Sequence, residues 1–439
     1  MILNWGNFES YLREKMREQH IPGVAVAVSR NGNLLFGKGF GYSDLKSENK
    51  VTLDTIFGIA SVTKSFTALA IIKLEEEGRL SIEDAVVDHL PELVIPSIKE
   101  MKEIKIFHLL THTTGIAPLK RREELNKLRE HIVYLSSEPH EVLGKPGEYF
   151  SYCNDSFILL GAIIERLTGK LFRRYITEVL LNELQLFRTT MSLEEVAKYD
   201  NVSTPYVWNM ETESLEENPW PILGNYEVGG GIRSNALDLL KYGEVYCHEK
   251  RENGKIPASN VVKKMWENPF KITENNYYGF GWKVTPNYNS YTLVEHGGGQ
   301  PGVSSNVGFI PEIGLVVVVL CNVSNVAAND IWLAAVNTAL QIPLEQKRVE
   351  YKHKDDIVFD QLNRFVGTYT SKEGGYAAIY LKNHHPTLST NGQEFSLQLV
   401  KEDTLLIKKL EKPITFFFKG EEKAWAILFG SRMFLRRER

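Results

Sequence analysis

Residues 22–42 read PGVAVAVSRNGNLLFGKGFGY, and this stretch predicts two strands joined by a tight turn. The segments 22–30 and 34–42 have the length and the apolar composition of strands. Asn31 and Gly32 lie between them, and both residue types tolerate the positive φ that a tight hairpin requires. We therefore expect an antiparallel hairpin near the start of the chain.

Strand patterns return late in the chain, after a long region that is rich in helix signals. Four segments have the spacing of an antiparallel meander, and a helix is expected to pack on them: strands at 278–284, 291–296, 303–310 and 314–322, and the helix at 331–341. The simplest assembly joins these strands and the early hairpin in one antiparallel sheet flanked by helices, with a helical domain inserted at about 61–270. We therefore expect an α+β domain over residues 1–345, with the candidate site in the crevice between sheet and insert.

The composition changes after this domain. A charged run at 343–359 predicts a linker, which we place at 346–360. Eight short apolar segments follow at intervals of roughly eight to ten residues, from GTYTS to RMFLRR. Short strands at even spacing are typical of an up-and-down barrel. We expect a small antiparallel barrel over residues 361–439.

The bulk composition is that of a soluble globular protein. Of 439 residues, 43% are hydrophobic and 24% are charged, and the net charge of −4 argues against nucleic acid as a partner. No apolar run approaches the roughly 18 residues of a membrane-spanning helix, and the N-terminal segment lacks a signal-peptide pattern. Three widely spaced cysteines, Cys153, Cys247 and Cys321, imply no disulfide framework. We therefore expect a cytoplasmic protein that does not associate with membranes.

The pattern serine, two residues, lysine occurs three times, and its context distinguishes one copy. Two copies begin at Ser43 and Ser47 in a polar loop, whereas Ser61-Val-Thr-Lys64 opens a strongly apolar helix. In a helix, residues i and i+3 share a face, so Ser61 Oγ would lie near Lys64 Nζ and near the positive end of the helix dipole. A lysine enclosed in an apolar site has a depressed pKa and can accept a proton. The alternative is that Ser61 only caps the helix while Lys64 extends to water.

Two helices of the predicted insert have clear end signals. Gly78 is expected to stop the helix that follows the Ser61 motif. A second helix is predicted at 155–168, with Asn154 or Asp155 as its cap and Gly169 as its stop.

Tyr152 and Asn154 lie directly before this second helix, after the turn signal Lys145-Pro146-Gly147. A tyrosine near a catalytic lysine can ionise or relay a proton, and an asparagine can hold a substrate amide. The alternative is a packed aromatic ring and a helix cap.

The stretch His296-Gly297-Gly298-Gly299 follows a predicted strand. Successive glycines let a substrate backbone lie close to a strand edge, and they leave an amide free to stabilise an oxyanion. The alternative is a flexible β-turn.

A pair of histidines, His108 and His112, is separated by four positions. A zinc site on a helix would also need a glutamate directly after the first histidine, and leucine is found there instead. We therefore predict no metal, and we interpret both histidines as packing or hydrogen-bonding residues.

Taken in order, these motifs resemble the penicillin-recognising serine hydrolases, in particular the class C β-lactamases and their CubicO-type relatives. The resemblance is carried by Ser61-x-x-Lys64, Tyr152-x-Asn154 and His296-x-Gly298, and by phrases such as LLTHTTGI, KPGEYFSYCN, VGGGIRS, YGFGW and EHGGGQPGV, over roughly residues 8–340. The C-terminal strands resemble the lipocalin-like barrel of archaeal CubicO-type serine peptidases, which are self-compartmentalising. The resemblance implies a β-lactamase-like fold followed by a lipocalin-like barrel.

The same resemblance implies a mechanism without cofactor or metal. Ser61 would be the nucleophile that forms an acyl-enzyme, and Lys64 would activate it. Tyr152 would assist proton transfer to the leaving group, and Asn154 would orient the substrate. The backbone N–H groups of Ser61 and Gly299 would form the oxyanion hole, beside Gly298 of the third motif.

One departure from the family pattern affects the expected substrate. The third motif usually begins with lysine, and this chain has His296, which is mostly neutral near pH 7. A permanent positive charge opposite the carboxylate of a penicillin is therefore missing, which argues against an efficient β-lactamase. His296 is left as a candidate third acid/base group beside Ser61 and Lys64.

We therefore predict a serine peptidase or amidase that acts on short peptides, including peptides with D-residues. A carboxylesterase acting on small esters is the alternative within the same chemistry, and a ligand-binding relative without activity is the alternative outside it. We expect the barrel to mediate assembly into a homo-oligomer, in the form of a closed, self-compartmentalising particle that restricts access to the cleft.

Overall fold

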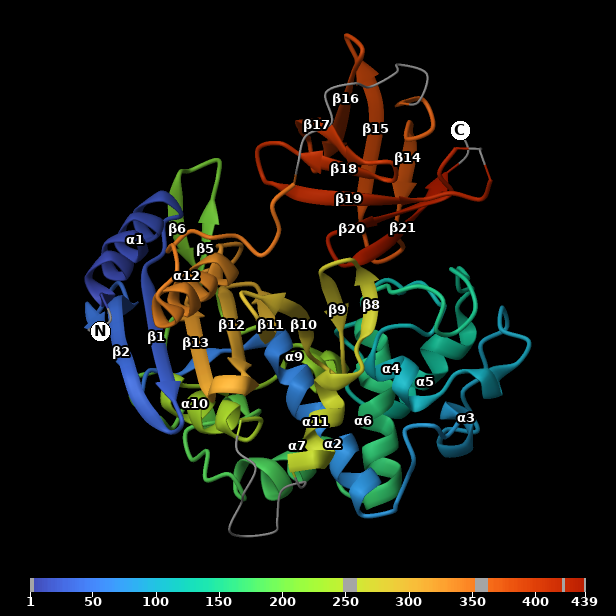
Figure 1. Ribbon diagram of the computed structural model, residues 1–439. Coiled ribbons are helices and arrows are strands. Elements are labelled where there is room, and N and C mark those ends of the chain that lie inside the picture. Colours follow the sequence, from blue (N-terminus) through green and yellow to red (C-terminus); the bar gives the residue numbers. More distant parts are fainter. Residues whose placement is uncertain (1–3, 248–258, 352–361, 421–422, 438–439) are drawn as a thin grey trace.

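A computed structural model describes residues 4–247, 259–351, 362–420 and 423–437. It has a larger N-terminal body built around one antiparallel sheet, and a closed β-barrel formed by the C-terminal part of the chain (Figure 1). This arrangement confirms the predicted α+β fold with an appended antiparallel barrel.

The central sheet has nine strands in the order β3-β2-β1-β13-β12-β11-β10-β9-β8, all antiparallel. Their bounds are β1 Gly23–Arg30, β2 Asn33–Asp44, β3 Asn49–Lys50, β8 Phe270–Thr273, β9 Asn276–Tyr278, β10 Lys283–Tyr288, β11 Tyr291–Gln300, β12 Val303–Ile310 and β13 Leu315–Cys321. The predicted N-terminal hairpin is confirmed as β1 and β2. The early and late parts of the chain meet where β1 pairs with β13, for example at Val26 and Val319.

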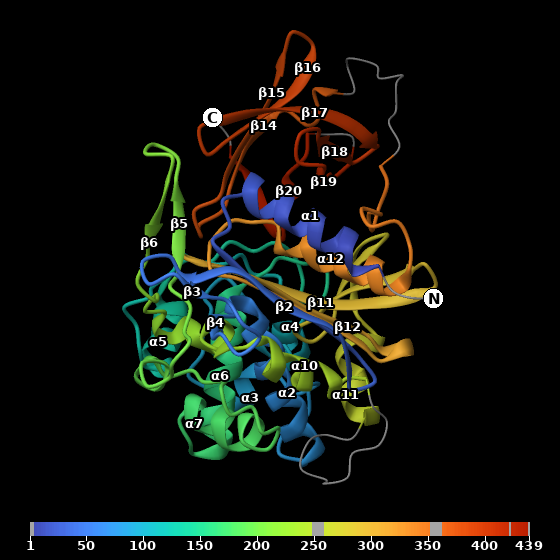
Figure 2. The ribbon, with the colours of Figure 1, turned by 90° about the vertical axis from the view of Figure 1, so that its left-hand side faces the viewer.

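Both faces of this sheet are buried, which explains the nearly continuous apolar composition of β1 and β13. Val24, Val26 and Val28 point to one face, against α1 (Trp5–Glu18) and α12 (Ala328–Leu340). The alternate residues of β1 and β13 point to the other face, where α10 (Ala236–Glu244) covers them. Figure 2 shows α1 and α12 on one side of the sheet and α2 and α10 on the other.

The segment between the two parts of the sheet is mainly helical. Its helices are α2 Thr63–Glu76, α3 Val86–His89, α4 Ile106–Leu110, α5 Leu128–Ser137, α6 Asn154–Thr168, α7 Phe172–Ile176, α8 Leu193–Val196, α9 Glu227–Gly230, α10 and α11 Ser259–Glu267. Two short strand pairs accompany them: β4 Phe57–Gly58 with β7 Arg233–Ser234, and β5 Tyr206–Asn209 with β6 Ser214–Glu217. α2 is buried on almost all sides, as is expected of a central helix. Gly78 and Gly169 have φ values of 69° and 68°, so both predicted helix stops are confirmed.

Two local predictions are wrong. The predicted strand 278–284 is broken by a turn, in which Gly279 N donates to Trp282 O at 2.7 Å. Gly281 has a φ of 69°, which a strand does not have, and it packs so closely on α2 that a Cβ atom there would lie 2.9 Å from Lys64 O. The second helix begins at Asn154, and its N-cap residue is Cys153, whose side chain makes no cap hydrogen bond.

The C-terminal strands close into the predicted eight-stranded barrel. They are β14 Gly367–Thr370, β15 Tyr376–Lys382, β16 His385–Thr390, β17 Gln393–Lys401, β18 Thr404–Ile407, β19 Lys412–Phe417, β20 Ala426–Phe429 and β21 Arg432–Arg437. Inward-facing apolar side chains fill the barrel, among them Tyr369, Leu388 and Ile414. Most of the predicted linker 346–360 lies outside the described residues. Positions 361, 421–422 and 438–439 of the predicted barrel 361–439 also lie outside them.

The β20–β21 hairpin attaches the barrel to the body. Tyr152 N donates to Ser431 O at 2.8 Å, and Met433 N donates to Ser151 Oγ at 3.1 Å. Apolar residues from both parts form one cluster around these bonds: Ala117, Leu143, Phe150, Tyr152 and Tyr278 with Ala426, Leu428 and Met433. Figure 1 shows β20 and β21 directly above the β8–β9 hairpin. The barrel is thus held against the segment that carries Tyr152.

Two further structural facts bear on the predicted setting. Cys153, Cys247 and Cys321 are all unpaired. None of the helices in the described part of the chain has the length and apolar character that crossing a membrane requires.

Candidate active site

Ser61 and Lys64 lie together at the start of α2, as the sequence predicts. Lys64 Nζ donates to Ser61 Oγ at 3.3 Å and to Gly229 O at 3.0 Å. Ser61 lies in a single 3-10 turn, Ala60–Val62, and the residue before it, Ala60, has a φ of 45°. A positive φ at an alanine is strained backbone, which is common at functional sites.

Lys64 is enclosed, with only 1% of its surface exposed, so the alternative in which it extends to water is wrong. Burial, and then the positive charges of Arg432 and Arg121, lowers the pKa of Lys64 to about 7, against the opposing effect of Glu373. The amine is therefore neutral in a large fraction of molecules near pH 7 and can accept a proton.

The Lys64 amine is accommodated by a glycine that the sequence analysis did not single out. A Cβ atom at Gly229 would lie 2.9 Å from Lys64 Nζ. The neighbouring Thr67 Oγ1 donates to Val228 O at 2.6 Å and joins α2 to α9. The phrase VGGGIRS supplied the only sequence signal for this contact.

Tyr152 lies beside the Ser61 and Lys64 pair. Its ring centroid is 5.0 Å from Lys64 Nζ, and its hydroxyl faces Ser61 without a hydrogen bond of ordinary geometry to any described residue. Burial raises the pKa of Tyr152 well above 10, although Ser61 and Arg432 oppose this shift. The phenol therefore stays protonated at neutral pH, which suits a proton donor.

His112 holds the segment that carries Tyr152. Its Nδ1 accepts from Cys153 N at 3.1 Å, its carbonyl accepts from Ser151 N at 3.0 Å, and its ring lies 4.2 Å from the Tyr152 ring. Burial lowers the pKa of His112 well below its usual value, so the ring is neutral. His108 Nδ1 accepts from Lys105 N at 3.0 Å. Both histidines hydrogen-bond to backbone, as predicted.

His296 lies in the same cleft, but both of its ring nitrogens are engaged. Nε2 lies 2.9 Å from Tyr278 Oη, and Nδ1 lies 2.7 Å from Gly297 O. A carbonyl can only accept, so Nδ1 carries the proton and Nε2 accepts from Tyr278. Burial, and then the charge of Lys64, lowers the pKa of His296 to about 3. A neutral imidazole with both nitrogens occupied is poorly suited to exchange protons with Ser61.

The three glycines after His296 differ in their surroundings. They continue β11 and pair with β12, with Gly298 opposite Ser305, so the alternative of a flexible turn is wrong. A Cβ atom at Gly298 would lie 2.2 Å from Ile59 O and 2.4 Å from Ser305 Oγ, whereas one at Gly299 would meet nothing within 4 Å. Gly298 thus lets the strand approach the segment that precedes Ser61, and Gly299 faces open space.

Asn154 is connected to the barrel. Its Nδ2 donates to Glu373 Oε1 at 3.1 Å, and the other carboxylate oxygen of Glu373 accepts from Arg432 Nε. The Arg432 guanidinium lies 5.3 Å from the Tyr152 ring centroid. Glu373 and Arg432 are site residues that the sequence analysis missed, because nothing in the barrel pattern distinguishes them.

A cleft of about 990 Å³ brings these groups together. Ser61, Tyr152, Asn154, His296 and all three glycines line it, and so do barrel residues of the β18–β19 and β20–β21 turns. Every residue that the sequence analysis proposed for the site lies in this cleft or, in the case of Lys64, directly beneath Ser61.

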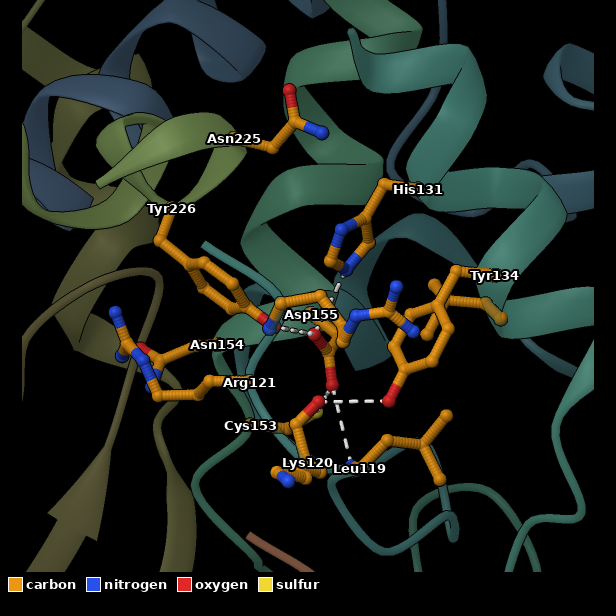
Figure 3. A network of polar contacts seen from close by, with 12 residues as sticks. Leu119, Lys120, Arg121, His131, Tyr134, Cys153, Asn154, Asp155, Asn225 and Tyr226 are labelled. Carbon is orange, nitrogen blue, oxygen red and sulfur yellow. Dashed lines mark hydrogen bonds and ion pairs between the residues drawn. The ribbon is translucent and has the colours of Figure 1, made fainter. Parts of the chain in front are cut away.

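A buried polar network supports one wall of the cleft (Figure 3). Asp155 Oδ1 lies 3.0 Å from His131 Nε2 and accepts from Tyr226 Oη at 3.2 Å, while Oδ2 accepts from Leu119 N at 3.4 Å. The guanidinium of Arg121 lies 4.2 Å from the Tyr226 ring centroid. Through these contacts the start of α6 fixes the loop that presents Arg121 to the cleft.

In the part of the chain that the structure describes, no group of three or more histidine, cysteine, aspartate or glutamate side chains is arranged to hold a metal ion.

Comparisons with known proteins show the family to which this chain belongs. A family model described as beta-lactamase matches residues 8–339, which is more than half of the chain. The chain belongs to the beta-lactamase family of serine hydrolases.

Three relatives illustrate the extent of the similarity. Protein flp of Staphylococcus aureus (strain MW2) is 30% identical over 334 residues, which are 72% of this chain but only 63% of flp. Penicillin-binding protein 4* of Bacillus subtilis (strain 168) is 26% identical over 438 residues, 94% of each protein. The solved structure of the octameric penicillin-binding protein homologue from Pyrococcus abyssi is 28% identical, with a TM-score of 0.74 over 99% of this chain and 100% of that one. The chain thus spans less than two thirds of flp, whereas the other two similarities include the barrel.

We expect alanine to lower the stability of the protein at Gly298 but not at Gly299. Gly298→Ala should lower stability by about 1–3 kcal/mol, because its Cβ would overlap the backbone carbonyl of Ile59. Gly299→Ala is the matched control, and its unfolding midpoint should stay near that of the wild type. Thermal and urea unfolding measure both. Equal midpoints for the two variants would contradict the close approach of β11 to Ile59.

Proposed function

We propose that the chain is a serine peptidase or amidase that forms an acyl-enzyme on Ser61 and acts on short peptides. The observation that carries this proposal is the contact of 3.3 Å between Lys64 Nζ and Ser61 Oγ, made by a buried lysine whose pKa is lowered to about 7. A hydroxyl beside a neutral amine is an activated nucleophile.

In the first half of the reaction, Ser61 Oγ attacks the carbonyl carbon of the scissile amide and Lys64 takes the hydroxyl proton. The C–N bond then breaks, and the leaving amine takes a proton from Tyr152, which is replenished from Lys64. Two features support this role of Tyr152: its phenol is kept protonated by burial, and its ring lies 5.0 Å from Lys64 Nζ.

In the second half, a water molecule attacks the acyl group and gives a proton to Lys64. The bond between the acyl carbon and Ser61 Oγ breaks, and the serine regains its proton. We assign the oxyanion hole to the backbone N–H groups of Ser61 and Gly299. The open space beside Gly299, and the close approach of Gly298 to Ile59, support this assignment.

We assign Asn154 and His296 to binding. Asn154 lines the cleft and would orient the substrate amide. His296, neutral and held by Tyr278, would shape the edge of the strand rather than exchange protons. This assignment makes Lys64 the general base, in place of Tyr152 or His296.

The substrates that we propose include peptides with D-residues, following the resemblance to penicillin-recognising enzymes. The same residues can also hydrolyse small esters, because an ester is an easier acyl donor than an amide. A cytoplasmic location is part of the proposal, supported by three unpaired cysteines.

Hydrolysis of matched L- and D-alanine anilides and short alanine peptides tests the proposal. Wild type should cleave at least one member of the set, and Ser61→Ala should lower the rate by at least about a thousandfold, because the nucleophile is lost. Mass spectrometry of wild type stopped during turnover should show the added mass of one acyl group.

The L to D ratio then defines the substrate class. Cleavage of esters alone, lost in Ser61→Ala, would overturn the peptidase proposal and support the esterase. Undiminished amide cleavage by Ser61→Ala would overturn the assignment of the nucleophile.

The pH dependence identifies the base. The kcat/KM should increase as pH rises through about 7, because the lowered pKa of Lys64 makes it a proton acceptor only above that value. The variant His296→Gln should show the same rise of kcat/KM near pH 7, since the pKa of His296 is about 3. Lys64→Arg should lose activity, because arginine stays protonated. If the rise of kcat/KM with pH were lost in His296→Gln, the histidine would be the titrating group.

We also propose that the chain forms a homo-oligomer in which the barrel contributes to the contacts. The similarity over its full length to a protein described as octameric supports this. Size-exclusion chromatography with light scattering should give a multiple of the mass of the 439-residue chain. Deleting residues 346–439 should reduce that multiple, and a monomeric full-length chain would contradict the proposal.

A further inference from the structure

The cleft beside Ser61 is lined by more cationic than acidic side chains, although the whole chain has a net charge of −4. Among the described residues that line the cleft, one is acidic, Asp330, and five are cationic: Arg121, Lys283, Lys409, Lys412 and Arg432. His296 adds no charge, because it is neutral above pH 3 or so. A concave surface lined by one sign of charge raises the local concentration of ligands of the opposite sign.

The barrel supplies three of these five cations. Lys409 and Lys412 lie at the turn between β18 and β19, and Arg432 is the first residue of β21. Within the described part of the chain, neither Lys409 nor Lys412 forms an ion pair. Lys283 on the body differs from them, because burial lowers its pKa and the charge of Glu295 opposes that shift. Arg121 is paired with Glu123. The exposed charges of Lys409 and Lys412 are thus not used in ion pairs of the fold.

One hydrogen bond orients the guanidinium of Arg432, and its other donors are left for a ligand. Its Nε donates to Glu373, which is itself held by Asn154 at 3.1 Å. The two terminal amino groups of Arg432 make no hydrogen bond with another described residue. A planar guanidinium that is fixed through Nε presents these remaining donors as a fork, which matches the two oxygens of a carboxylate.

Arg432 lies on the side of the cleft where the leaving group of the substrate would bind. Its guanidinium lies 5.3 Å from the Tyr152 ring centroid, and Tyr152 is the group to which we assign proton delivery to the leaving amine. A carboxylate held by Arg432 would therefore belong to the leaving group. The cation that the family pattern places at the start of the third motif is absent here, because that position is His296.

Resting on the proposed amidase function, we propose that the substrates are peptides whose leaving-group half carries a carboxylate, and that Arg432 of the barrel is the residue that holds it. Lys409 and Lys412 extend this cationic wall and draw acidic peptides toward the cleft. Under this proposal the barrel is a specificity-determining part of the active site.

Two alanine peptides that differ only in a C-terminal carboxylate or carboxamide test this proposal. Wild type should show a kcat/KM at least about tenfold higher for the acid. Arg432→Gln should lower this acid-to-amide ratio about tenfold or more, because it removes a charged, forked hydrogen bond. Arg432→Lys should give an intermediate ratio. The ratio is the informative quantity, since Arg432 also affects the pKa of Lys64 and so changes the rate with both peptides.

The lysines of the β18–β19 turn have their own matched control. The double variant Lys409→Gln, Lys412→Gln should lower the ratio several-fold at low salt and weaken its dependence on ionic strength. Lys408→Gln removes another exposed charge from the same turn at a position that does not line the cleft, and it should leave the ratio unchanged.

Binding to Ser61→Ala separates this proposal from the proposed function. Calorimetry should show tighter binding of the acid than of the amide, and Arg432→Gln in the same background should abolish the difference. This result is expected even if the wild type turns over esters alone. Equal affinity for acid and amide in Ser61→Ala, or an acid-to-amide ratio that survives Arg432→Gln, would overturn the carboxylate site whatever the outcome of the hydrolysis experiments.

Discussion

The burial of the Lys64 amine is the constraint on which the rest of the site depends. A charged amine in an apolar interior is costly unless it is paired, and no carboxylate among the described residues forms an ion pair with Lys64. The amine has a serine hydroxyl and a backbone carbonyl as its partners, so burial lowers its pKa to about 7. Gly229 leaves room for Nζ, and Gly281 lets the 279–282 turn lie against the Lys64 carbonyl. Much of the packing around α2 therefore keeps a single amine away from water.

The barrel completes a site that the larger body leaves open on one side. The Ser431 carbonyl accepts from Tyr152 N and Met433 N donates to Ser151 Oγ, which attaches the barrel beside Tyr152. Glu373 connects Asn154 with Arg432. The two parts are also coupled electrostatically, because the charge of Arg432 lowers the pKa of Lys64 while Glu373 opposes that effect. A change in the docking of the barrel would therefore alter both the shape of the cleft and the basicity of the lysine.

Much of the fold could be predicted, because it follows from local patterns. Alternating valines define β1, Asn31-Gly32 defines its hairpin, and even spacing defines the barrel. The predicted strand 278–284 failed for a tertiary reason: Gly281 adopts a positive φ in order to pack on α2. His296 was predicted as an acid/base candidate because sequence shows its type but not its hydrogen-bond partner, Tyr278.

The sequence by itself determined the family and the order of the elements, because both follow from local patterns and motifs. It also determined the Ser61–Lys64 pair, because residues three positions apart at the start of a helix share a face. Only the tertiary structure decided how that pair is tuned and which groups surround it. The pKa of Lys64 depends on burial by distant segments, and Arg432 reaches the cleft only because β20 and β21 dock beside Tyr152. Residues 61, 152, 296 and 432 line one cleft because segments that are far apart in the sequence pack together, and no local spacing provides a signal for such packing.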